Sequence, residues 1–309
     1  MRRYGDSKRI RDSVAGYLLV TLAALLPVRI GAAQQTPSPE EGLKVLPLTV
    51  QSVAVKGALP LNDPLSKLWG QAKEVTVKLI PQTAQEPKLA KASIGTVRVR
   101  ALHNDGWVAF RLDWADPTAD NNLRSDKFGD AAAVEFPMKT NPLPDYRMGS
   151  EDKPVHLLLW RADRQWAKQS GKTFLERNYP RAHSDTYPFA PRAGEDKIAN
   201  QPERDQYLAA QAAGNPIVPG IAPIIEELNA ATWNQLSVQT HQDARGIGVH
   251  RNGRWFVVFA RPLVTADAND APLPSGSLGL VAFAVWDGGS EHAHARKMVS
   301  EGWVRLKVK

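Results

Sequence analysis

Much of the chain consists of short segments in which apolar and polar residues alternate, separated by turn-forming residues. The stretch TVRVRALHNDGWVAFRLDWAD at 96–116 predicts two strands joined by a turn at Asn104–Gly106. A second hairpin is predicted in IGVHRNGRWFVVFARPL at 247–263, where Asn252 and Gly253 form the turn. Many short strands separated by turns are typical of an antiparallel β-sandwich. We therefore expect an all-β fold, an antiparallel β-sandwich with helical and loop insertions.

Three further short runs are mainly apolar and predict strands, the last of which is expected to be buried on both faces. They cover 131–136, which Pro137 closes, 155–160 and VAFAVW at 281–286. The last run is followed by the turn WDGG and then by RKMVSEGWVRL, in which Lys297 and Met298 must point to opposite faces of a strand. Only one of these two side chains can face the interior of the sandwich.

The alternating pattern is lost between 164 and 240, where aromatic, proline and charged residues mix without a period. A long stretch of this kind predicts an insertion of ordered surface loops on the sandwich. Within it we expect two short helices, at ERDQYLAAQAA (203–213) and PIIEELNAATW (223–233). This insertion is a candidate surface for partner proteins.

The N-terminal region predicts export. Basic residues come first, sixteen uncharged residues follow from Ser13 to Val28, and small residues lie at 31–33, as in a secretory signal peptide. Sixteen residues are fewer than the roughly 20 that span a bilayer comfortably, so contact with a membrane is expected only if this segment is not cleaved. The predicted organisation is a signal peptide at 1–33, a flexible N-terminus at 34–48 and one domain at 49–309.

Charge and composition exclude several classes of function. The net charge is +7, but residues 1–33 hold six basic and two acidic residues, which leaves 33 against 30 in the rest of the chain. A charge of +3 gives no reason to propose nucleic acid as a partner. The chain has no cysteine, which excludes disulfides, iron–sulfur ligation and covalent c-type haem attachment.

A bound metal would therefore need other ligands, and methionines are scarce. After residue 33 there are only Met138, Met148 and Met298. Lysine can bind a metal only after it loses its proton, which a desolvated site favours, and Lys297 beside an apolar strand is a candidate. We expect His156, on the strand after Met148, to be a half-buried residue, with haem ligation as the alternative.

Two other classes of function remain open. No nucleophile elbow, HExxH, Walker A or GxGxxG motif occurs, so hydrolase chemistry would depend on carboxylates such as Asp113 and Asp116. If exposed, Trp107, Trp114 and Trp255 could stack on sugars. A secreted carbohydrate-binding β-sandwich is therefore the alternative function.

Four blocks, in this order along the chain, carry a resemblance to a known family. They are DAAAVEFP at 130–137, YRMGSEDKPVHLLLWRAD at 146–163, GRWFVVFARPL at 253–263, and VAFAVWDGG with RKMVSEGWVRL at 281–306. Together they resemble the haem-binding gamma subunits of periplasmic molybdenum enzymes related to ethylbenzene dehydrogenase, dimethylsulfide dehydrogenase, selenate reductase and chlorate or perchlorate reductase. The stretch from 164 to 240 is longer than the compact members of that family require.

The resemblance implies a β-sandwich that holds one haem b without covalent attachment, between a methionine and a lysine. By position in the motifs the lysine is Lys297 and the methionine is Met148, with Met138 as the alternative. It also implies an electron-transfer subunit without substrate chemistry of its own, in the periplasm. Its partners would be a molybdopterin catalytic subunit, an iron–sulfur subunit and a soluble c-type cytochrome. Arg261 and Arg296 are weaker candidates for pairing with the haem propionates.

Overall fold

The computed structural model describes residues 43–172, 177–181, 223–273, 276 and 278–308. The predicted signal peptide and the predicted helix at 203–213 lie outside the described residues. Among the described residues, no helix has both the length and the apolar character needed to cross a bilayer. The domain limits predicted from the sequence are not tested by this description, except that the first strand starts at Val45, within the segment expected to be flexible.

Strands account for most of the regular structure, as the alternating pattern predicts. The helices described over their whole extent are one α-helix, α1 (Ala162–Ser170), and two short 3₁₀ helices, η2 (Lys67–Gln71) and η3 (Gly288–Ser290). The strands are β1 (Val45–Ala54), β2 (Val75–Pro81), β3 (Thr96–His103), β4 (Trp107–Ala115), β5 (Ala131–Pro137), β6 (Val155–Arg161), β7 (Ile225–Thr232), β8 (Gln235–Val238), β9 (Gly248–His250), β10 (Arg254–Pro262), β11 (Leu278–Trp286), β12 (Met298–Ser300) and β13 (Trp303–Lys307).

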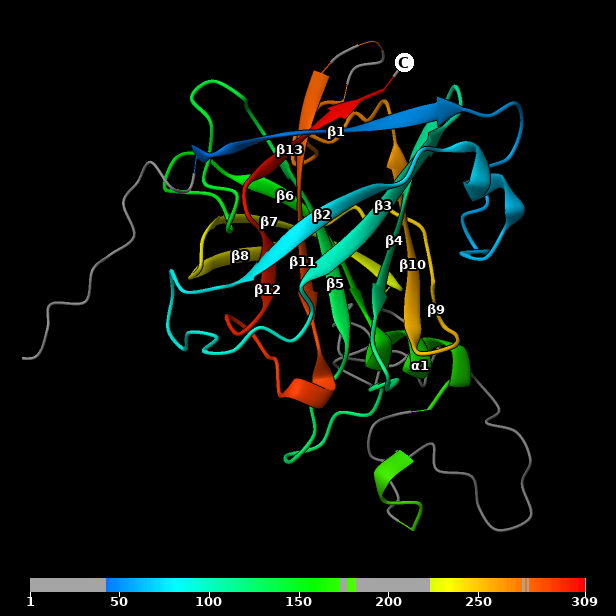
Figure 1. The fold of residues 1–309 in the computed structure, drawn as a ribbon, viewed down its shortest axis with the longest axis vertical. Helices are drawn as coiled ribbons and strands as arrows, with labels where there is room; N and C mark the ends of the chain where they lie inside the picture. The colour runs from blue at the N-terminus through cyan, green and yellow to red at the C-terminus, as the bar shows by residue number, and fades with distance from the viewer. Residues whose placement is uncertain (1–42, 173–176, 182–222, 274–275, 277, 309) are drawn as a thin grey trace, which may run out of the picture. The chain divides into compact units, whose positions relative to one another are not determined.

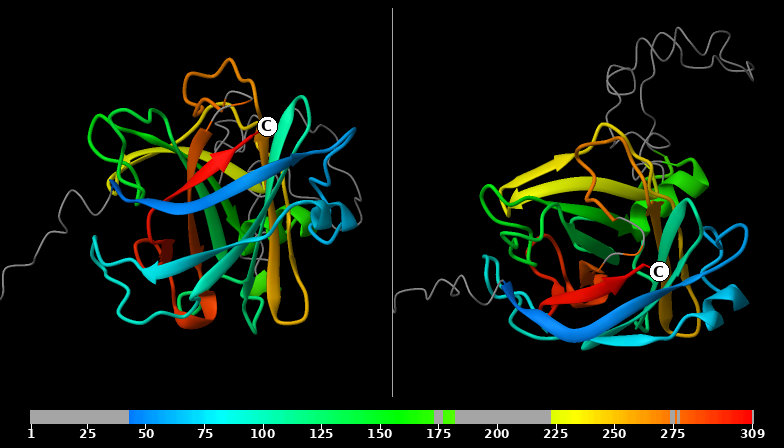
Figure 2. Two further views of the ribbon diagram at one scale, coloured as in Figure 1. Left: turned by 45° about the horizontal axis from the view of Figure 1, so that its top comes forward. Right: turned by 90° about the horizontal axis from the view of Figure 1, so that it is seen from above.

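These strands form a sheet that curves back on itself into two facing layers (Figures 1 and 2). The order β8-β7-β6-β5-β11 makes one layer, and β3-β4-β10-β9 makes most of the other, with β12 and β2 joining them. All pairings are antiparallel except those of β1, which runs parallel to β13 and to β3. The predicted antiparallel β-sandwich is confirmed.

The main core lies between the layers because each strand turns its alternate residues inward. From β5 and β6 it receives Val134, Phe136 and Leu158, and from β10 it receives Val257 and Phe259. A second apolar cluster covers the opposite face of β5, β6, β7 and β11 and includes Ala133, Leu157, Leu228 and Ala282. This outer cluster explains why β5 is buried along its whole length.

The predicted helix at 223–233 is wrong, because these residues form β7 between β6 and β8. Glu, Leu and Ala favour a helix locally, but pairing with two strands overrides that preference. Ile225 joins the inner core and Leu228 the outer cluster, which is the alternation of a strand. The α-helix α1 lies earlier in the expected insertion region, directly after β6.

Candidate functional site

The candidate site lies on the outer face of the layer that contains β5, β6 and β11, and its first member is Lys297. This residue directly precedes β12, whose first residue, Met298, is fully buried in the inner core. Lys297 points to the other face and is only 4% exposed. Strand alternation predicts that Lys297 and Met298 lie on opposite faces. The result is that the amine of Lys297 lies in an apolar environment.

Met148 meets Lys297 from the loop between β5 and β6. The Nζ atom of Lys297 lies 3.2 Å from the Sδ atom of Met148, and both side chains are buried. Met148 has a φ of 117°, and Gly149 follows with a φ of 72°. A Cβ atom at Gly149 would lie 2.8 Å from the Ala230 carbonyl oxygen and 2.9 Å from that of Lys153. Glycine is therefore required next to Met148, since only it fits this close approach.

Aromatic side chains surround the amine. The rings of Trp233 and Trp286 each have their centroids 4.9 Å from Lys297 Nζ, so a charged amine would be stabilised by their π faces. Trp303 closes the same cluster and donates its indole N–H to the Pro144 carbonyl oxygen at 3.0 Å. That bond connects the loop carrying Met148 to β13.

Glu135 is a member of the site that sequence reasoning missed. It comes from β5, is 6% exposed, and its Oε1 atom has no hydrogen-bond partner. Burial raises the pKa of Glu135 well above its ordinary value, although attraction to Lys297 opposes this change. Burial also lowers the pKa of Lys297 to about 8, again opposed by Glu135. The available signal was a single acid within the apolar run AAAVEFP.

The structure does not bring Met138 to Lys297. Met138 packs against the inner core instead of the outer cluster, and its Sδ atom lies 3.9 Å from Asn229 Nδ2. It also lines a cavity of about 800 Å³ together with Leu263 and Asp270. Of the two methionine candidates, only Met148 is in contact with the lysine.

The two arginine candidates lie elsewhere. Arg261 is fully buried, with its guanidinium over the ring of Phe136 at 5.7 Å, and it faces Asp270 at 3.7 Å. Arg296 directly precedes Lys297 in sequence but stacks over Phe128, at 5.4 Å from the ring centroid. Their pairing with haem propionates stays a prediction, and the interactions of both guanidinium groups described above are with residues other than Met148 and Lys297.

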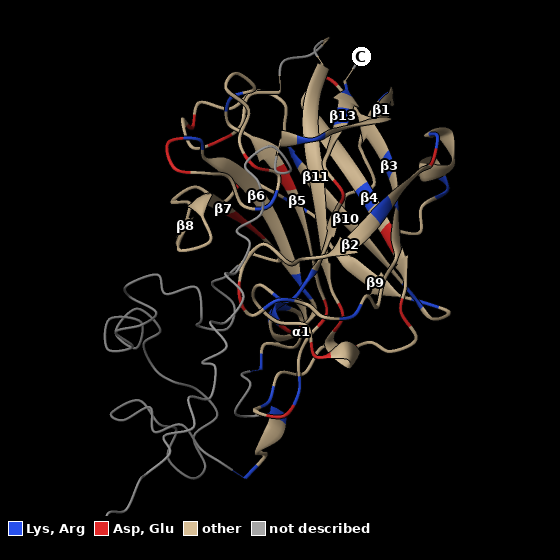
Figure 3. Ribbon diagram, turned by 60° about the vertical axis from the view of Figure 1, so that its left-hand side comes forward, with Lys and Arg blue, Asp and Glu red and all other residues tan. Residues whose placement is uncertain are grey.

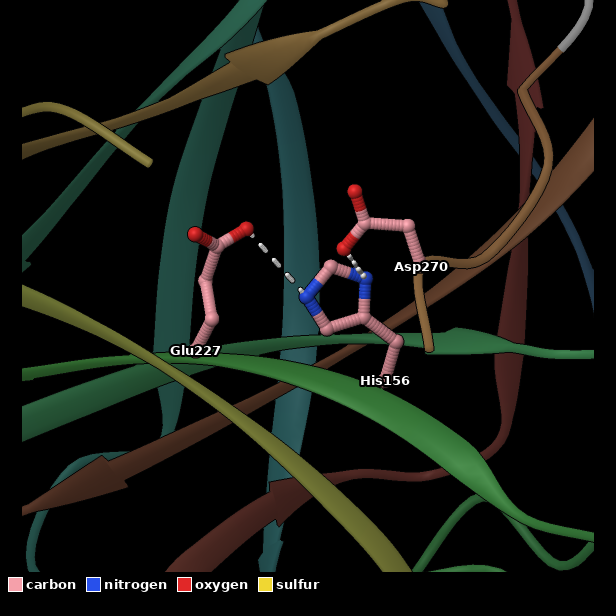
Figure 4. A group of neighbouring side chains, drawn as sticks. All are labelled: His156, Glu227 and Asp270. Atoms are coloured by element: carbon pink, nitrogen blue, oxygen red, sulfur yellow. Dashed lines mark ion pairs between the residues drawn. The ribbon is translucent and has the colours of Figure 1, made fainter. Parts of the chain in front are cut away.

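The sequence led us to expect that His156 is half-buried. The structure shows that it is fully buried between the layers. Figure 4 shows its ring between the carboxylates of Glu227 and Asp270. The Nε2 atom lies 3.6 Å from Glu227 Oε1, and the Nδ1 atom lies 3.6 Å from Asp270 Oδ1. Nδ1 also accepts hydrogen bonds from the Ala271 backbone N–H and from Arg261, both at 3.3 Å. Burial lowers the pKa of His156, so its imidazole is neutral at neutral pH.

The positions of Trp114, Trp255 and Asp113 do not support carbohydrate binding or hydrolase chemistry, the two other functions considered from the sequence. Trp114 and Trp255 are buried in the inner core, so the expectation that they are exposed is wrong. The Asp113 carboxylate pairs with Arg98 and Arg254. A carboxylate that is neutralised by two arginines is a poor general acid or base.

Among solved structures the chain is similar to a family 9 carbohydrate-binding module from Caldicellulosiruptor kristjanssonii in complex with cellotriose. That likeness has a TM-score of 0.37 and 9% identity, over 86% of this chain and 95% of the other. A protein from Bacteroides uniformis assigned as carbohydrate-binding gives a TM-score of 0.39 and 8% identity, over 84% and 99%. Likenesses this distant carry no functional argument.

Relatives by sequence are more informative. A protein of Haloferax mediterranei assigned as a respiratory nitrate reductase heme subunit is 26% identical, over 94% of this chain and 82% of its own length. The gamma subunit of dimethylsulfide dehydrogenase from Rhodovulum sulfidophilum is 21% identical, over 80% and 75%. The gamma subunit of chlorate reductase from Ideonella dechloratans is 24% identical, over 79% of each chain.

The family described as ethylbenzene dehydrogenase matches residues 66–297, well over half of the chain. This range includes Glu135, Met148 and Lys297. It agrees with the four sequence blocks that carry the resemblance, and that resemblance is confirmed. The chain belongs to the ethylbenzene dehydrogenase family.

Proposed function

We propose that this chain is a haem b-binding electron-transfer subunit of a periplasmic molybdenum oxidoreductase complex, with Met148 and Lys297 as the axial ligands of the haem iron. The contact between Lys297 Nζ and Met148 Sδ in a buried, aromatic-lined site carries the proposal. The relative from Haloferax mediterranei, assigned as a heme subunit, supports the choice of cofactor.

The residues present fit such a group chemically. A thioether is a neutral, soft ligand at every pH, and methionine is an established axial ligand of haem iron. An amine must be neutral to ligate, and burial that lowers the pKa of Lys297 to about 8 makes the neutral form accessible near neutral pH. The outer cluster supplies apolar and aromatic surface on either side of the pair.

The two ligand atoms touch, and this limits how the site can be filled. The 3.2 Å contact therefore has to open when an iron is accommodated. Both side chains are unbranched and have several rotatable bonds, so changes of rotamer could separate their ends.

The chain's own residues would then set the properties of the site. Bound haem supplies one-electron redox chemistry, while Lys297 and Met148 fix its orientation and the buried surroundings exclude water. Glu135, beside the lysine, supplies a second protonatable group. Asp113 is neutralised by arginines and His156 lies in the inner core, so neither adds substrate chemistry here.

The proposed partners follow from the named relatives. Two are gamma subunits, of dimethylsulfide dehydrogenase and chlorate reductase, which implies assemblies with other subunits. We propose a molybdopterin catalytic subunit and an iron–sulfur subunit, with a soluble c-type cytochrome as the external redox partner. The basic and apolar N-terminal segment supports export to the periplasm.

The proposal is tested by reconstituting the exported chain with haem and recording absorption and low-temperature electron paramagnetic resonance spectra. We expect a low-spin b-type spectrum that Lys297→Ala and Met148→Ala each convert to high-spin or abolish. Met138→Ala is the matched control, because it removes the same side chain from a position that does not contact Lys297. A low-spin spectrum that survives both ligand substitutions, or that only Met138→Ala changes, would contradict the assignment.

A further inference from the structure

A second group of acidic side chains lies outside the candidate haem site, at the end of the sandwich where β5 begins and β11 ends. Asp116 directly follows β4, Asp130 directly precedes β5, and Asp287 directly follows β11. One carboxylate oxygen from each lies within 4.8 Å of the others. Figure 3 shows acidic residues in the loops at this end, near α1. Three separate segments of the chain therefore bring their carboxylates together.

No basic side chain compensates these charges. Among the residues that the structure describes, none of the ion pairs involves Asp116, Asp130 or Asp287. Asp120 adds a fourth carboxylate nearby. If a Cβ atom were added at Gly289, the Oδ2 atom of Asp120 and the Oδ1 atom of Asp287 would both lie 3.3 Å from it. Thr118 Oγ1 lies 3.1 Å from that same position. The group is thus rich in oxygen and carries uncompensated negative charge.

Asp116 gives an independent indication that something is bound. Its side chain is 1% exposed, and its Oδ1 atom accepts a hydrogen bond from the Thr118 backbone N–H at 3.1 Å. Its Oδ2 atom is buried and makes no well-formed hydrogen bond; the donor directed at this carboxylate is the indole N–H of Trp114, which opposes the rise in the Asp116 pKa that burial causes. An unpartnered buried carboxylate oxygen beside two other carboxylates is costly unless a cation binds it.

The surrounding hydrogen bonds hold the carboxylates in place without neutralising them. Asp130 Oδ1 accepts from the Gly288 backbone N–H at 2.8 Å, and its Oδ2 accepts from the Asp120 backbone N–H and from Trp255 Nε1. Asp287 accepts from the backbone N–H and the hydroxyl of Ser290. Donors of this kind orient carboxylates around a metal ion and leave lone pairs free for it.

We propose that Asp116, Asp130 and Asp287 bind a hard divalent cation of the calcium class. The three carboxylates offer oxygen donors, which calcium prefers, while the Nδ1 atom of the neighbouring His292 is occupied by a hydrogen bond from the Asp287 backbone N–H at 3.2 Å. The cation ties the end of β4, the start of β5 and the turn after β11 to one another. The site is independent of haem binding, and its ligands are not those of the proposed haem iron.

The alternative is a proton shared between the carboxylates. Burial, followed by repulsion from Asp116, raises the pKa of Asp130 to about 7. Below that pH a proton on Asp130 relieves part of the repulsion, and it competes with the cation. A shared proton would relieve this repulsion without any metal, and this difference separates the two alternatives.

Terbium luminescence distinguishes the two, because Tb³⁺ occupies calcium sites and is excited by energy transfer from a nearby indole. Trp255 donates to Asp130 at 2.8 Å and therefore lies beside the site. Chelator-treated, haem-free protein is titrated with Tb³⁺ under excitation of tryptophan, and the signal is then competed with Ca²⁺ and with Mg²⁺. We expect saturable, sensitised emission that Ca²⁺ displaces, and a lower emission intensity at saturation in Trp255→Phe.

Two ligand variants and one control complete the test. Asp116→Asn and Asp287→Asn should weaken Ca²⁺ competition about 10–100-fold, and Ca²⁺ should raise the Tm of wild type but not of Asp116→Asn. Asp126→Asn is the control, since this residue lies between Asp116 and Asp130 in sequence but is exposed. Absence of sensitised emission and of any Ca²⁺-dependent Tm shift, with Asp116→Asn more stable than wild type, would overturn the proposal in favour of the shared proton.

Discussion

Glu135 and Lys297 are two buried titratable groups that interact electrostatically at the site where Lys297 meets the Met148 thioether. Glu135 comes from β5 and Lys297 from the residue before β12, so the pair bridges two strands that flank β11. Each residue opposes the effect of burial on the pKa of the other. Such pairs add little net stability, but removing one partner leaves an uncompensated buried charge.

Replacing Lys297 should change the pH dependence of stability in the haem-free protein. Because burial lowers the pKa of Lys297 from 10.5 to about 8, the unfolded chain binds one more proton than the folded chain between these values. The free energy of unfolding contributed by this group therefore rises as the pH increases from 8 to 10.5. The change amounts to about 3 kcal/mol, at about 1.36 kcal/mol for each pKa unit.

Urea unfolding of wild type and of Lys297→Met across pH 7 to 10.5 measures this contribution. Methionine keeps a similar volume, so the difference between the two proteins reports the charge. We expect the free energy of unfolding of wild type to rise relative to that of Lys297→Met as the pH increases from 7 to 10.5. Parallel curves would show that the lysine is not desolvated. The double variant that combines Lys297→Met with Glu135→Gln should be more stable at pH 7 than Lys297→Met alone, because the second substitution removes the unpaired carboxylate.

Part of this site could be predicted from sequence, and the rest depends on pairing that sequence does not show. The opposite orientation of Lys297 and Met298 follows from strand alternation alone. Met148 could be preferred to Met138 only through the family resemblance, because the faces on which they lie depend on the loop after β5 and on Gly149. Glu135 stands out in its apolar run, but its partner comes from a strand more than 160 residues away in the sequence.

The fold shows the same limits. The alternating hairpin segments became β3, β4, β9 and β10, because their pattern and turns are local signals. At 223–233 the local preference for a helix was misleading, since β7 gains its stability from β6 and β8 on either side. The three tryptophans expected to be exposed lie on strands whose inward face can be assigned only once the layers are known.

Gly149 should be essential to the position of Met148. In Gly149→Ala the added Cβ would lie within 3 Å of two carbonyl oxygens at a positive φ, so the loop must move. We expect a loss of about 1–3 kcal/mol in stability and weaker haem retention. Gly171→Ala is the matched control, because Gly171 has a similar φ of 66° but open space around its Cβ position. Equal losses in stability from both substitutions, with haem retention unchanged, would show that crowding at Gly149 is unimportant.

Gln165 should be needed to attach α1 to the sandwich. Its Oε1 atom accepts from Trp160 Nε1 and from the Gly248 backbone N–H, both at 2.7 Å, and its Nε2 atom donates to the Gly248 carbonyl oxygen. Gln165→Ala leaves these buried groups unpaired, and we expect it to cost about 2–4 kcal/mol in thermal or urea unfolding. Gln169→Ala, an exposed position on the same helix, should change stability by less than about 0.5 kcal/mol. Similar values for the two variants would mean that water replaces the lost amide.

Replacing Arg261 should lower the stability of the protein and leave haem binding unchanged. Its guanidinium is fully buried between the layers, facing Asp270 and the neutral ring of His156. Arg261→Met removes the only positive charge of this group and leaves Asp270 and Glu227 uncompensated, at a cost of about 3–5 kcal/mol. The double variant Arg261→Met with Asp270→Asn should recover part of that loss. Because Arg261 does not contact the Lys297–Met148 pair, the haem spectrum and affinity of the folded double variant should match wild type. Weaker haem binding without a loss in stability would instead place Arg261 at the propionates.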